Sequence, residues 1–433
     1  MIKGFSKLST AEKQKLILEH IGRESDQELF TLTRLGQKET EELITSFSEN
    51  VISIFPFPYS IAPNFLIDGQ EYLVPFVTEE SSVVAAAAKS AKFWFERGGF
   101  KTEIIGNTKY GQIHIISDIS FDLFNSKIEE YKDRLFAAVA SINDKMIKRG
   151  GGIKTISLLD KSSQLSEYFQ LNVGFNTCDA MGANYMNSCL EGIANEINSI
   201  FHNDPTLDAY ILEVVMSILS NYSPENAVKI WVDTPVSELD DGRLGMDTFD
   251  FARKFVRAVE IAEVDVNRAV THNKGMYNGI DSVALATGND WRAIEANGHA
   301  YASKSGTYSS LSHATVKDDI FRFEAIIPMQ VGTVGGVTAL HPLTKLSLDI
   351  LGNPSAEELM KVIAAAGLAS NFAAVKALTT TGIQKGHMKM HLSNILSGLG
   401  ATAQETELVK QYFSDKTISN AEVEYYLKKL RSE

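Results

Sequence analysis

The order of strands and helices between residues 102 and 233 constrains the fold of this chain more than any other feature. Six segments carry the periodicity of strands or helices: strands near 102–116, 153–159, 168–175 and 228–233, and amphipathic helices near 123–148 and 182–203. Strands and helices in the order β-α-β-β-α-β fit a ferredoxin-like split βαβ module. We therefore predict a small domain of this kind over residues 108–222.

A chain of 433 residues exceeds one ordinary core, so the module should be inserted into a larger protein. We predict an α+β fold in which residues 1–107 and 223–380 form a large mixed helix/sheet domain. Residues 381–433, rich in lysine and glutamate, should form a C-terminal helical appendage. The pattern G-x-G-x-x-G is missing, so the small domain is not expected to be a Rossmann domain.

Charge and cysteine content exclude several classes of protein. A formal net charge of -13 disfavours binding to nucleic acid or to an anionic membrane surface. The two cysteines, Cys178 and Cys189, cannot form a disulfide framework or a thiolate zinc site, and they suit a reducing compartment. Apolar runs such as Val83–Ala88 fall short of the roughly 20 residues of a membrane span. We expect a soluble cytoplasmic protein.

Local signals predict the elements around the candidate site. Tyr72–Val77 should be a strand, and the alanine-rich segment Ser81–Arg97 should be a helix. Residues 246–300 should combine a helix with an apolar strand, Ser282–Ala286, and Lys274 should lie in a polar loop before that strand.

Further capping signals predict helices at both ends of the chain. Ser9 and Ser25 carry capping-box spacing, so two N-terminal helices are expected, ended by Gly22 and Gly36. The segment from Ser355 to about residue 377 and most of the last fifty residues should also be helical.

The segment Asp179-Ala180-Met181-Gly182-Ala183-Asn184 is a candidate anion site. It follows a predicted strand and directly precedes a predicted helix. Free backbone N–H groups at a helix start, with a glycine that permits close approach, can bind a pyrophosphate. An ordinary Asp N-cap with a glycine turn explains the same residues and stays open.

Three other segments carry charged residues for which both a functional and an ordinary structural explanation are open. Lys274 could be a solvated lysine or a functional cation, and Asp290 could be a turn residue or a group at the end of a strand. Glu79 and Glu80 precede a helix, where acidic side chains are stabilised by the helix dipole. That position lowers a carboxyl pKa, whereas a proton donor at neutral pH needs a raised one.

His387 and His391 stand four residues apart, the spacing of half a metal site. The glutamate of H-E-x-x-H is missing, because Met388 follows the first histidine. No metal site is therefore expected. The glycine-rich turn Gly332–Gly336 lacks the Lys-Ser/Thr of a phosphate loop.

Together these segments resemble one family along nearly the whole chain, the hydroxymethylglutaryl-coenzyme A reductases, and specifically the bacterial class without membrane spans. Eight blocks carry the resemblance: Glu49–Ile52, Ala62–Phe65, Val74–Glu80, Asp179–Asn184, His272–Asp281, Thr287–Asp290, Gly332–Gly336 and Gly386–His391. Two departures are visible, since Ser53 stands where the family usually has glycine and Ser81 where this class usually has proline.

The resemblance implies roles for individual residues. Lys274 is the catalytic lysine, Glu80 the catalytic acid, Asp290 the aspartate that holds both in a network, and His387 the catalytic histidine. It places substrate contacts on three further residues, which are Ser82, Arg268 and Asn278. Asp179, Met181, Gly182, Ala183 and Asn184 form the cofactor-binding turn.

It also implies a reaction and an assembly. The family interconverts hydroxymethylglutaryl-CoA and mevalonate plus CoA by two hydride transfers with NADPH or NADH. Lys274 would stabilise the oxyanion, His387 would protonate the CoA thiolate, and Glu80 would protonate the aldehyde oxygen. An obligate homodimer is implied, in which the small domain of one subunit brings the nicotinamide to the large domain of its partner. The resemblance also makes residues 381–433 a flap over the site, with a hinge near residues 379–382. Without the resemblance, two alternatives stay open: another nicotinamide-linked oxidoreductase without a Rossmann fold, and a CoA- or nucleotide-binding interaction module that performs no catalysis.

Overall fold

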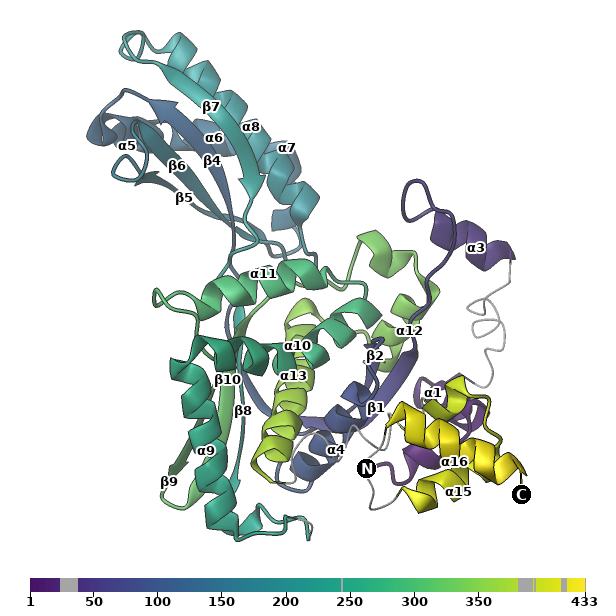
Figure 1. Cartoon of the computed structure of the whole chain (residues 1–433). Coiled ribbons are helices and arrows are strands. Elements are labelled where there is room, and N and C mark those ends of the chain that lie inside the picture. Colours follow the sequence, from purple (N-terminus) through teal and green to yellow (C-terminus); the bar gives the residue numbers. More distant parts are fainter. Residues whose placement is uncertain (24–37, 243, 381–391, 393–394, 414–418, 433) are drawn as a thin grey trace.

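The structure, a computed structural model, describes residues 1–23, 38–242, 244–380, 392, 395–413 and 419–432. Within these ranges the strands form three sheets, and the sheet that contains β4, β5, β6 and β7 projects with its helices from the main body as a separate unit (Figure 1). A two-stranded sheet pairs β1 with β2, and two four-stranded sheets have the orders β3-β8-β10-β9 and β5-β6-β4-β7. The predicted α+β class is confirmed.

The main body packs helices against the β1-β2 and β3-β8-β10-β9 sheets. Its strands are β1 (Tyr59–Ile67), β2 (Gln70–Val77), β3 (Lys101–Gly106), β8 (Ala227–Pro235), β9 (Ser312–Lys317) and β10 (Ile320–Pro328). Its helices are α4 (Val83–Phe95), α9 (Thr248–Val264), α10 (Val266–Ala286), α11 (Trp291–Ala302), α12 (Pro342–Ile350) and α13 (Ala356–Thr379). The main body has one hydrophobic core, whose residues precede and follow the projecting unit in the sequence. They run from Ala62 to Phe100 and from Val228 to Val375.

The projecting unit has a core of its own, whose buried residues run from Ile113 to Leu207. Its elements are β4 (Lys109–Ser117), α5 (Phe121–Glu130), α6 (Lys132–Ala138), α7 (Ala140–Ile147), β5 (Gly152–Asp160), β6 (Tyr168–Asn176), α8 (Ala183–Asn203) and β7 (Leu212–Leu219). β6 lies between β4 and β5 and is antiparallel to both. This order agrees with the predicted split βαβ arrangement, but its fourth strand is β7, whereas the strand predicted near residues 228–233 is β8 of the main body.

Some predicted elements have different bounds. The helix expected near residues 123–148 is three helices, because the backbone leaves helical geometry at Tyr131 and at Val139. The strand expected near 102–116 is two strands, β3 and β4, which belong to different sheets. Four strands were missed by sequence periodicity: β1, β7, β9 and β10.

The prediction for residues 271–286 is wrong. The expected polar loop around Lys274 and the expected strand Ser282–Ala286 both belong to α10. Buried residues recur along this helix at Ala269, Met276, Ile280 and Val283, with helical spacing. A short apolar run such as Ser282–Ala286 cannot be assigned to strand or helix by periodicity alone.

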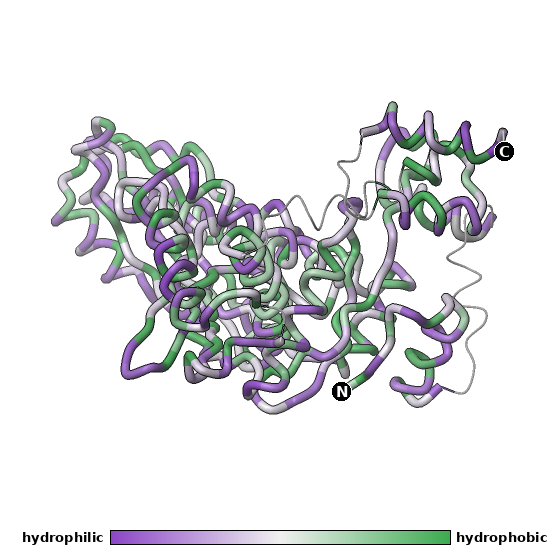
Figure 2. Tube along the Cα trace, turned by 60° about the horizontal axis from the view of Figure 1, so that its bottom comes forward, coloured by the Kyte–Doolittle hydropathy of each residue, from purple (hydrophilic) through white to green (hydrophobic). Residues whose placement is uncertain are grey.

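Helix α13 is buried on all sides over residues 362–372. In the part of the chain that the structure describes, it is also the one helix long and apolar enough to cross a membrane, although 67% of its most apolar stretch is buried within the protein. Figure 2 shows hydrophobic segments gathered in the middle of the main body. We interpret α13 as the central core helix of the fold, a role that the sequence search for long uninterrupted apolar runs did not reveal.

Both ends of the chain are helical, as predicted. The N-terminal segment contains η1 (Phe5–Lys7), α1 (Thr10–His20) and α3 (Lys38–Thr45), and the C-terminal segment contains α15 (Ala403–Tyr412) and α16 (Asn420–Ser432). The C-terminal helices share a small core of their own, which includes Val409 and Val423. The second predicted N-terminal helix, residues 25–36, lies outside the described residues.

Two glycines of α10 should respond in opposite ways to an added methyl group. A Cβ at Gly279 would collide with the carbonyl of Ala366 on α13, whereas a Cβ at Gly275 would lie 3.5 Å from the Asn371 side chain, an ordinary contact. We expect Gly279→Ala to destabilise the protein by about 1–3 kcal/mol through overpacking. Gly275→Ala should raise stability by up to about 1 kcal/mol through helix propensity. Thermal unfolding measures both, and equal melting temperatures for the two variants would contradict the close helix contact.

Candidate active site

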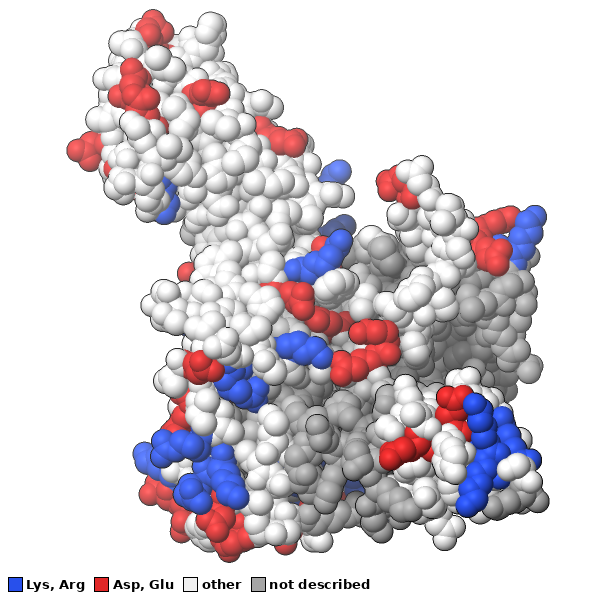
Figure 3. Space-filling model, viewed as in Figure 1, with Lys and Arg blue, Asp and Glu red and all other residues white. Residues whose placement is uncertain are grey.

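An ion pair joins two segments that are far apart in the sequence. The Lys274 Nζ lies 2.9 Å from the Glu80 Oε2, and the two side chains are 61% and 39% exposed. Figure 3 shows acidic and basic side chains gathered in the middle of one face of the molecule, below the projecting unit. A charged pair this accessible can meet a ligand from solvent.

The chain between β2 and α4 presents Glu80 to this pair. The Glu80 amide donates to the Thr78 hydroxyl, 3.3 Å away, and Ser82 then adopts a left-handed backbone with φ 80° before α4 begins. Glu79 is exposed, whereas Glu80 is half-buried against Lys274. A left-handed serine is strained, which is a recurrent property of functional positions.

Helix α10 presents further polar groups on the face that carries Lys274. Asn278 and Asp281 follow at four and seven residues, so they lie on that face. Burial raises the pKa of the Asp281 carboxyl to about 8, the charge of Glu295 on α11 acts in the same direction, and Lys274 opposes it. A carboxyl group that keeps its proton at neutral pH therefore follows Lys274 on this helix, a feature that the sequence analysis missed.

The residues before Lys274 anchor the helix. Buried His272 contacts the Ser312 hydroxyl at 2.6 Å, and the Asn371 amide donates to the His272 carbonyl at 2.8 Å. Burial, and then the nearby Arg268, lower the pKa of His272 to about 3. Its imidazole is therefore neutral and structural at pH 7. The half-buried Arg268 lies six residues before Lys274, about 9 Å along the helix axis.

Asp290 lies between two helices, not at the end of a strand as predicted. Its carboxylate accepts from the amides of Arg292 and Ala293 and so caps α11. The same carboxylate forms an ion pair with the Arg292 guanidinium at 3.1 Å. The contacts recorded for Asp290 are thus local, and Lys274 pairs with Glu80 instead. His387 lies outside the described residues.

The segment Asp179–Asn184 forms the turn before α8, as predicted. Gly182 stands at the N-cap with φ 92°, where a Cβ would collide with Thr177. No side chain caps α8, and its first turn contains no acidic residue. The expected Asp N-cap is absent at this helix, because the Asp179 carboxylate accepts from the Ala356 amide at the start of α13, 2.8 Å away. The uncapped N–H groups suit an anionic ligand.

Other sequence blocks meet at this turn. Gly332 packs against the backbone of Ala180 and Met181, and the Thr333 amide donates to the Asp179 carbonyl. The Gly332 amide also donates to the Asn289 side chain at 2.8 Å. The glycine-rich turn therefore links the Asp179–Asn184 turn to the segment that precedes Asp290.

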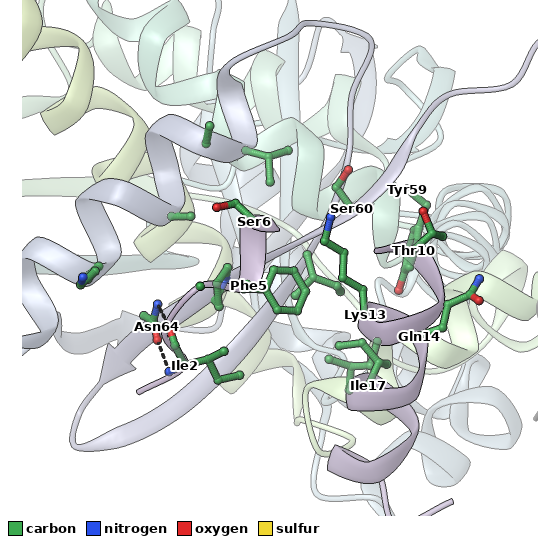
Figure 4. Close-up of a pocket in the computed structure, with 18 of the residues that line it drawn as sticks. Ile2, Phe5, Ser6, Thr10, Lys13, Gln14, Ile17, Tyr59, Ser60 and Asn64 are labelled. Atoms are coloured by element: carbon green, nitrogen blue, oxygen red, sulfur yellow. Dashed lines mark hydrogen bonds between the residues drawn. The ribbon is translucent and has the colours of Figure 1, made fainter. Parts of the chain in front are cut away.

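A cavity of about 1180 Å³ lies between the N-terminal segment, β1 and α4. Asn64, also left-handed at φ 69°, binds the backbone of Ile2 through both polar atoms of its side chain (Figure 4). The floor is apolar, with Phe5 and Ile17, and lysines from two helices, Lys13 and Lys89, are among the lining residues. Among the described residues, no cluster of three or more metal-ligating side chains occurs.

The comparison with known proteins assigns the family. The family model of hydroxymethylglutaryl-coenzyme A reductase matches residues 9–392. The chain belongs to this family. A 3-hydroxy-3-methylglutaryl-coenzyme A reductase of Archaeoglobus fulgidus is 36% identical over 94% of this chain and 89% of its own length. A probable reductase of Borreliella burgdorferi is 35% identical over 91% of this chain and 88% of its own length.

Solved structures of the reductase family agree. A reductase from Streptococcus pneumoniae is 36% identical, covers 99% of both chains and has a TM-score of 0.79. A class II reductase of the same organism, bound to NADPH in open conformations, has a TM-score of 0.78 and covers 87% of this chain and 99% of its own. The expected class II reductase is thereby confirmed. As a reductase, the protein converts hydroxymethylglutaryl-CoA to mevalonate with hydride from a nicotinamide cofactor.

The pKa of Asp281 predicts how stability depends on pH. A carboxyl whose pKa is raised by folding keeps its proton in the folded state, so stability falls as pH rises between the unfolded and the folded pKa. An asparagine side chain at this position cannot ionise. We therefore expect Asp281→Asn to gain stability relative to the native protein as pH rises, by up to about 1.4 kcal/mol per pH unit. Melting temperatures at pH 5 and pH 8 test this, and a pH-independent difference would contradict it.

Proposed function

We propose that Lys274 and Glu80 are the reacting groups of this reductase. The observation that carries the proposal is their ion pair of 2.9 Å between segments 194 residues apart. Hydride addition to a thioester carbonyl builds negative charge on oxygen, which a fixed ammonium group stabilises. The Lys274 ammonium supplies a cation at this position, and the adjoining Glu80 side chain, after it takes up a proton from solvent, can deliver that proton to the same oxygen.

The proposed sequence of steps assigns one proton transfer to each of two groups. The first reduction gives a hemithioacetal, whose oxyanion Lys274 stabilises. Its collapse releases the CoA thiolate, which His387 protonates, a role carried over from the family resemblance. Glu80 protonates the aldehyde oxygen during the second reduction. The raised pKa of Asp281 keeps this carboxyl protonated at neutral pH, so it holds a proton on the same helix as Lys274.

We propose that Asp290 belongs to this network, as the family resemblance implies. The family resemblance gives it a direct role with Lys274 and Glu80, whereas its recorded contacts are the cap of α11 and Arg292. Substrate contacts are proposed for Ser82, Arg268 and Asn278. Ser82 and Asn278 stand beside Glu80 and on the Lys274 face of α10, respectively, which supports both assignments.

The 1180 Å³ cavity is proposed to hold part of the CoA moiety. Its apolar floor suits the pantetheine chain or the adenine ring, and its lysines suit the phosphates. Val84 and Ala85, which line the cavity, follow Glu80 by a few residues on the first turn of α4. This continuity supports a path from the cavity to the reacting groups.

A nicotinamide dinucleotide is proposed to bind at the Asp179–Asn184 turn. The fit rests on the uncapped α8 and on Gly182, whose left-handed backbone and close packing against Thr177 set the shape of the turn. The bound cofactor would supply the hydride of both reductions. Met181, Ala183 and Asn184 complete the turn that holds its phosphates. We propose that NADPH is accepted, as in the pneumococcal relative, and assays with NADH in parallel measure the preference.

We further propose a cytoplasmic homodimer. Residues 108–222 would act as the cofactor-binding domain, residues 1–107 and 223–380 as the acyl-CoA-binding and dimerisation domain, and residues 381–433 as a flap. The two independent hydrophobic cores support the first division. The small separate core shared by α15 and α16 supports the division between residues 223–380 and the flap.

Substitution of the reacting groups should lower turnover while ligands still bind. We expect Lys274→Ala to lower kcat roughly 10²–10³-fold because the oxyanion loses its cation. Glu80→Gln should lower kcat roughly 10²–10⁴-fold because it cannot donate a proton. The measurement is NADPH oxidation with hydroxymethylglutaryl-CoA, with mevalonate quantified as product.

Lys254→Ala, on an exposed position of α9, is the matched control and should keep full activity. A binding module without catalysis would instead show no NADPH oxidation in the native protein, and Lys274→Ala would weaken ligand binding. Retention of native kcat by Lys274→Ala would overturn the proposed role.

A mixing experiment tests the shared site. If each site combines the large domain of one subunit with the small domain of its partner, Lys274→Ala and Gly182→Ala chains should complement each other. Random heterodimers carry one intact site, so about a quarter of native activity should return on co-refolding. No recovery from heterodimers shown to form would place each site within one subunit.

A further inference from the structure

Lys109 is a buried cation that the proposed chemistry does not use. It begins β4 and is 4% exposed. Its ammonium donates to the Thr177 hydroxyl at 2.7 Å, to the Ala180 carbonyl at 2.9 Å and to the Met181 carbonyl at 3.1 Å. All three N–H donors of the lysine are therefore occupied, and two of them hold the turn that precedes α8.

Burying this charge has a cost. Removal from water lowers the pKa of Lys109 to about 8, although Cys178 and Asp179 oppose the change. Glu357 of α13 lines the same small cavity of about 200 Å³ and is the further titratable group facing it among the described residues. An apolar side chain of similar size would fill this position without the desolvation penalty. The charge itself therefore calls for a functional explanation.

The turn held by Lys109 is the one with uncapped amides. Helix α8 lacks both a side-chain cap and an acid in its first turn. The carbonyls of Ala180 and Met181 accept from the buried ammonium, so the negative ends of these two peptide groups are directed into the protein. A ligand phosphate at the turn would then meet N–H groups, with a positive charge behind them.

We propose that Lys109 is a positioning residue for the cofactor, which fixes the Asp179–Asn184 turn and places a buried positive charge beneath the phosphates of the dinucleotide. The inference rests on the proposed binding of the cofactor at this turn. It means that Lys109 of β4, about 70 residues before the turn in the sequence, also determines the affinity for the cofactor. It also couples that affinity to the protonation state of a buried amine.

The test measures the dissociation constant of NADPH by fluorescence titration from pH 7 to pH 9.5. The cofactor phosphates are already ionised in this range, since their second pKa is about 6. In the native protein, affinity should fall about tenfold as Lys109 loses its proton near pH 8, which corresponds to about 1.4 kcal/mol. Lys109→Arg keeps its charge and should show no such step. Lys109→Met should bind about tenfold more weakly at pH 7 and also show no step.

Two controls separate Lys109 from its neighbours. Free thiols commonly ionise in the same pH range, so the Cys178→Ser variant is titrated in parallel. Its affinity for NADPH should fall with pH as in the native protein, because Lys109 is unchanged. Steady-state kinetics of Lys109→Met should show a raised KM for NADPH with the KM for hydroxymethylglutaryl-CoA unchanged. If Lys109 were purely structural, its substitution would change the melting temperature only. The fall in NADPH affinity with pH would then come from another group and would also appear in Lys109→Arg.

Failure of the two proposals can be told apart. If Gly182→Ala leaves NADPH affinity unchanged, the cofactor does not bind at this turn, and the proposed function of the turn is overturned. If Gly182→Ala weakens binding while the native protein shows no pH step, only the role of Lys109 is overturned. The native pH titration needs no substitution, so the test stands even if Lys109→Met fails to fold.

Discussion

The close contact between α10 and α13 is the constraint on which the site depends. Gly279 of α10 lies against the Ala366 carbonyl, and Gly367 of α13 lies against Ile280, so both helices approach at positions that lack side chains. His272 and Asn371 add a buried hydrogen bond across the same interface. This rigid packing fixes the helix that carries Lys274, while Lys274 itself stays on the accessible face, where Glu80 meets it.

Two lysines in this protein illustrate two ways of using a positive charge. Lys274 is accessible and pairs with Glu80, so its ammonium group can reach a developing oxyanion. Lys109 is buried, with all its donors bound to one turn, so it can act on a ligand only through that turn and through its field. The first arrangement suits chemistry, and the second suits the placement of a bound cofactor.

Sequence reasoning succeeded where the signal is local. The turn with Gly182 before α8, the capped helix at Ser9 and the helix after Ser355 follow from local patterns, whereas the predicted βαβ order took β8 of the main body for the fourth strand of the unit. It failed at α10, where Lys274 was placed in a loop and Ser282–Ala286 in a strand. The buried face of this helix carries the polar residues His272, Asn273 and Ser282 among its apolar ones, which obscures the apolar stripe by which an amphipathic helix is recognised.

The sequence by itself determined the family, the fold class and the residue types of the site. Short motifs identify the family and the residue types, and local periodicity predicts the helices and strands. Only the tertiary structure decided which groups meet. It paired Lys274 with Glu80, set the Asp281–Glu295 carboxyls beside them, left Asp290 with Arg292, and brought Lys109 beneath the turn before α8. The physical reason is that such contacts arise from helix and sheet packing between segments far apart in the chain, and no local propensity encodes them.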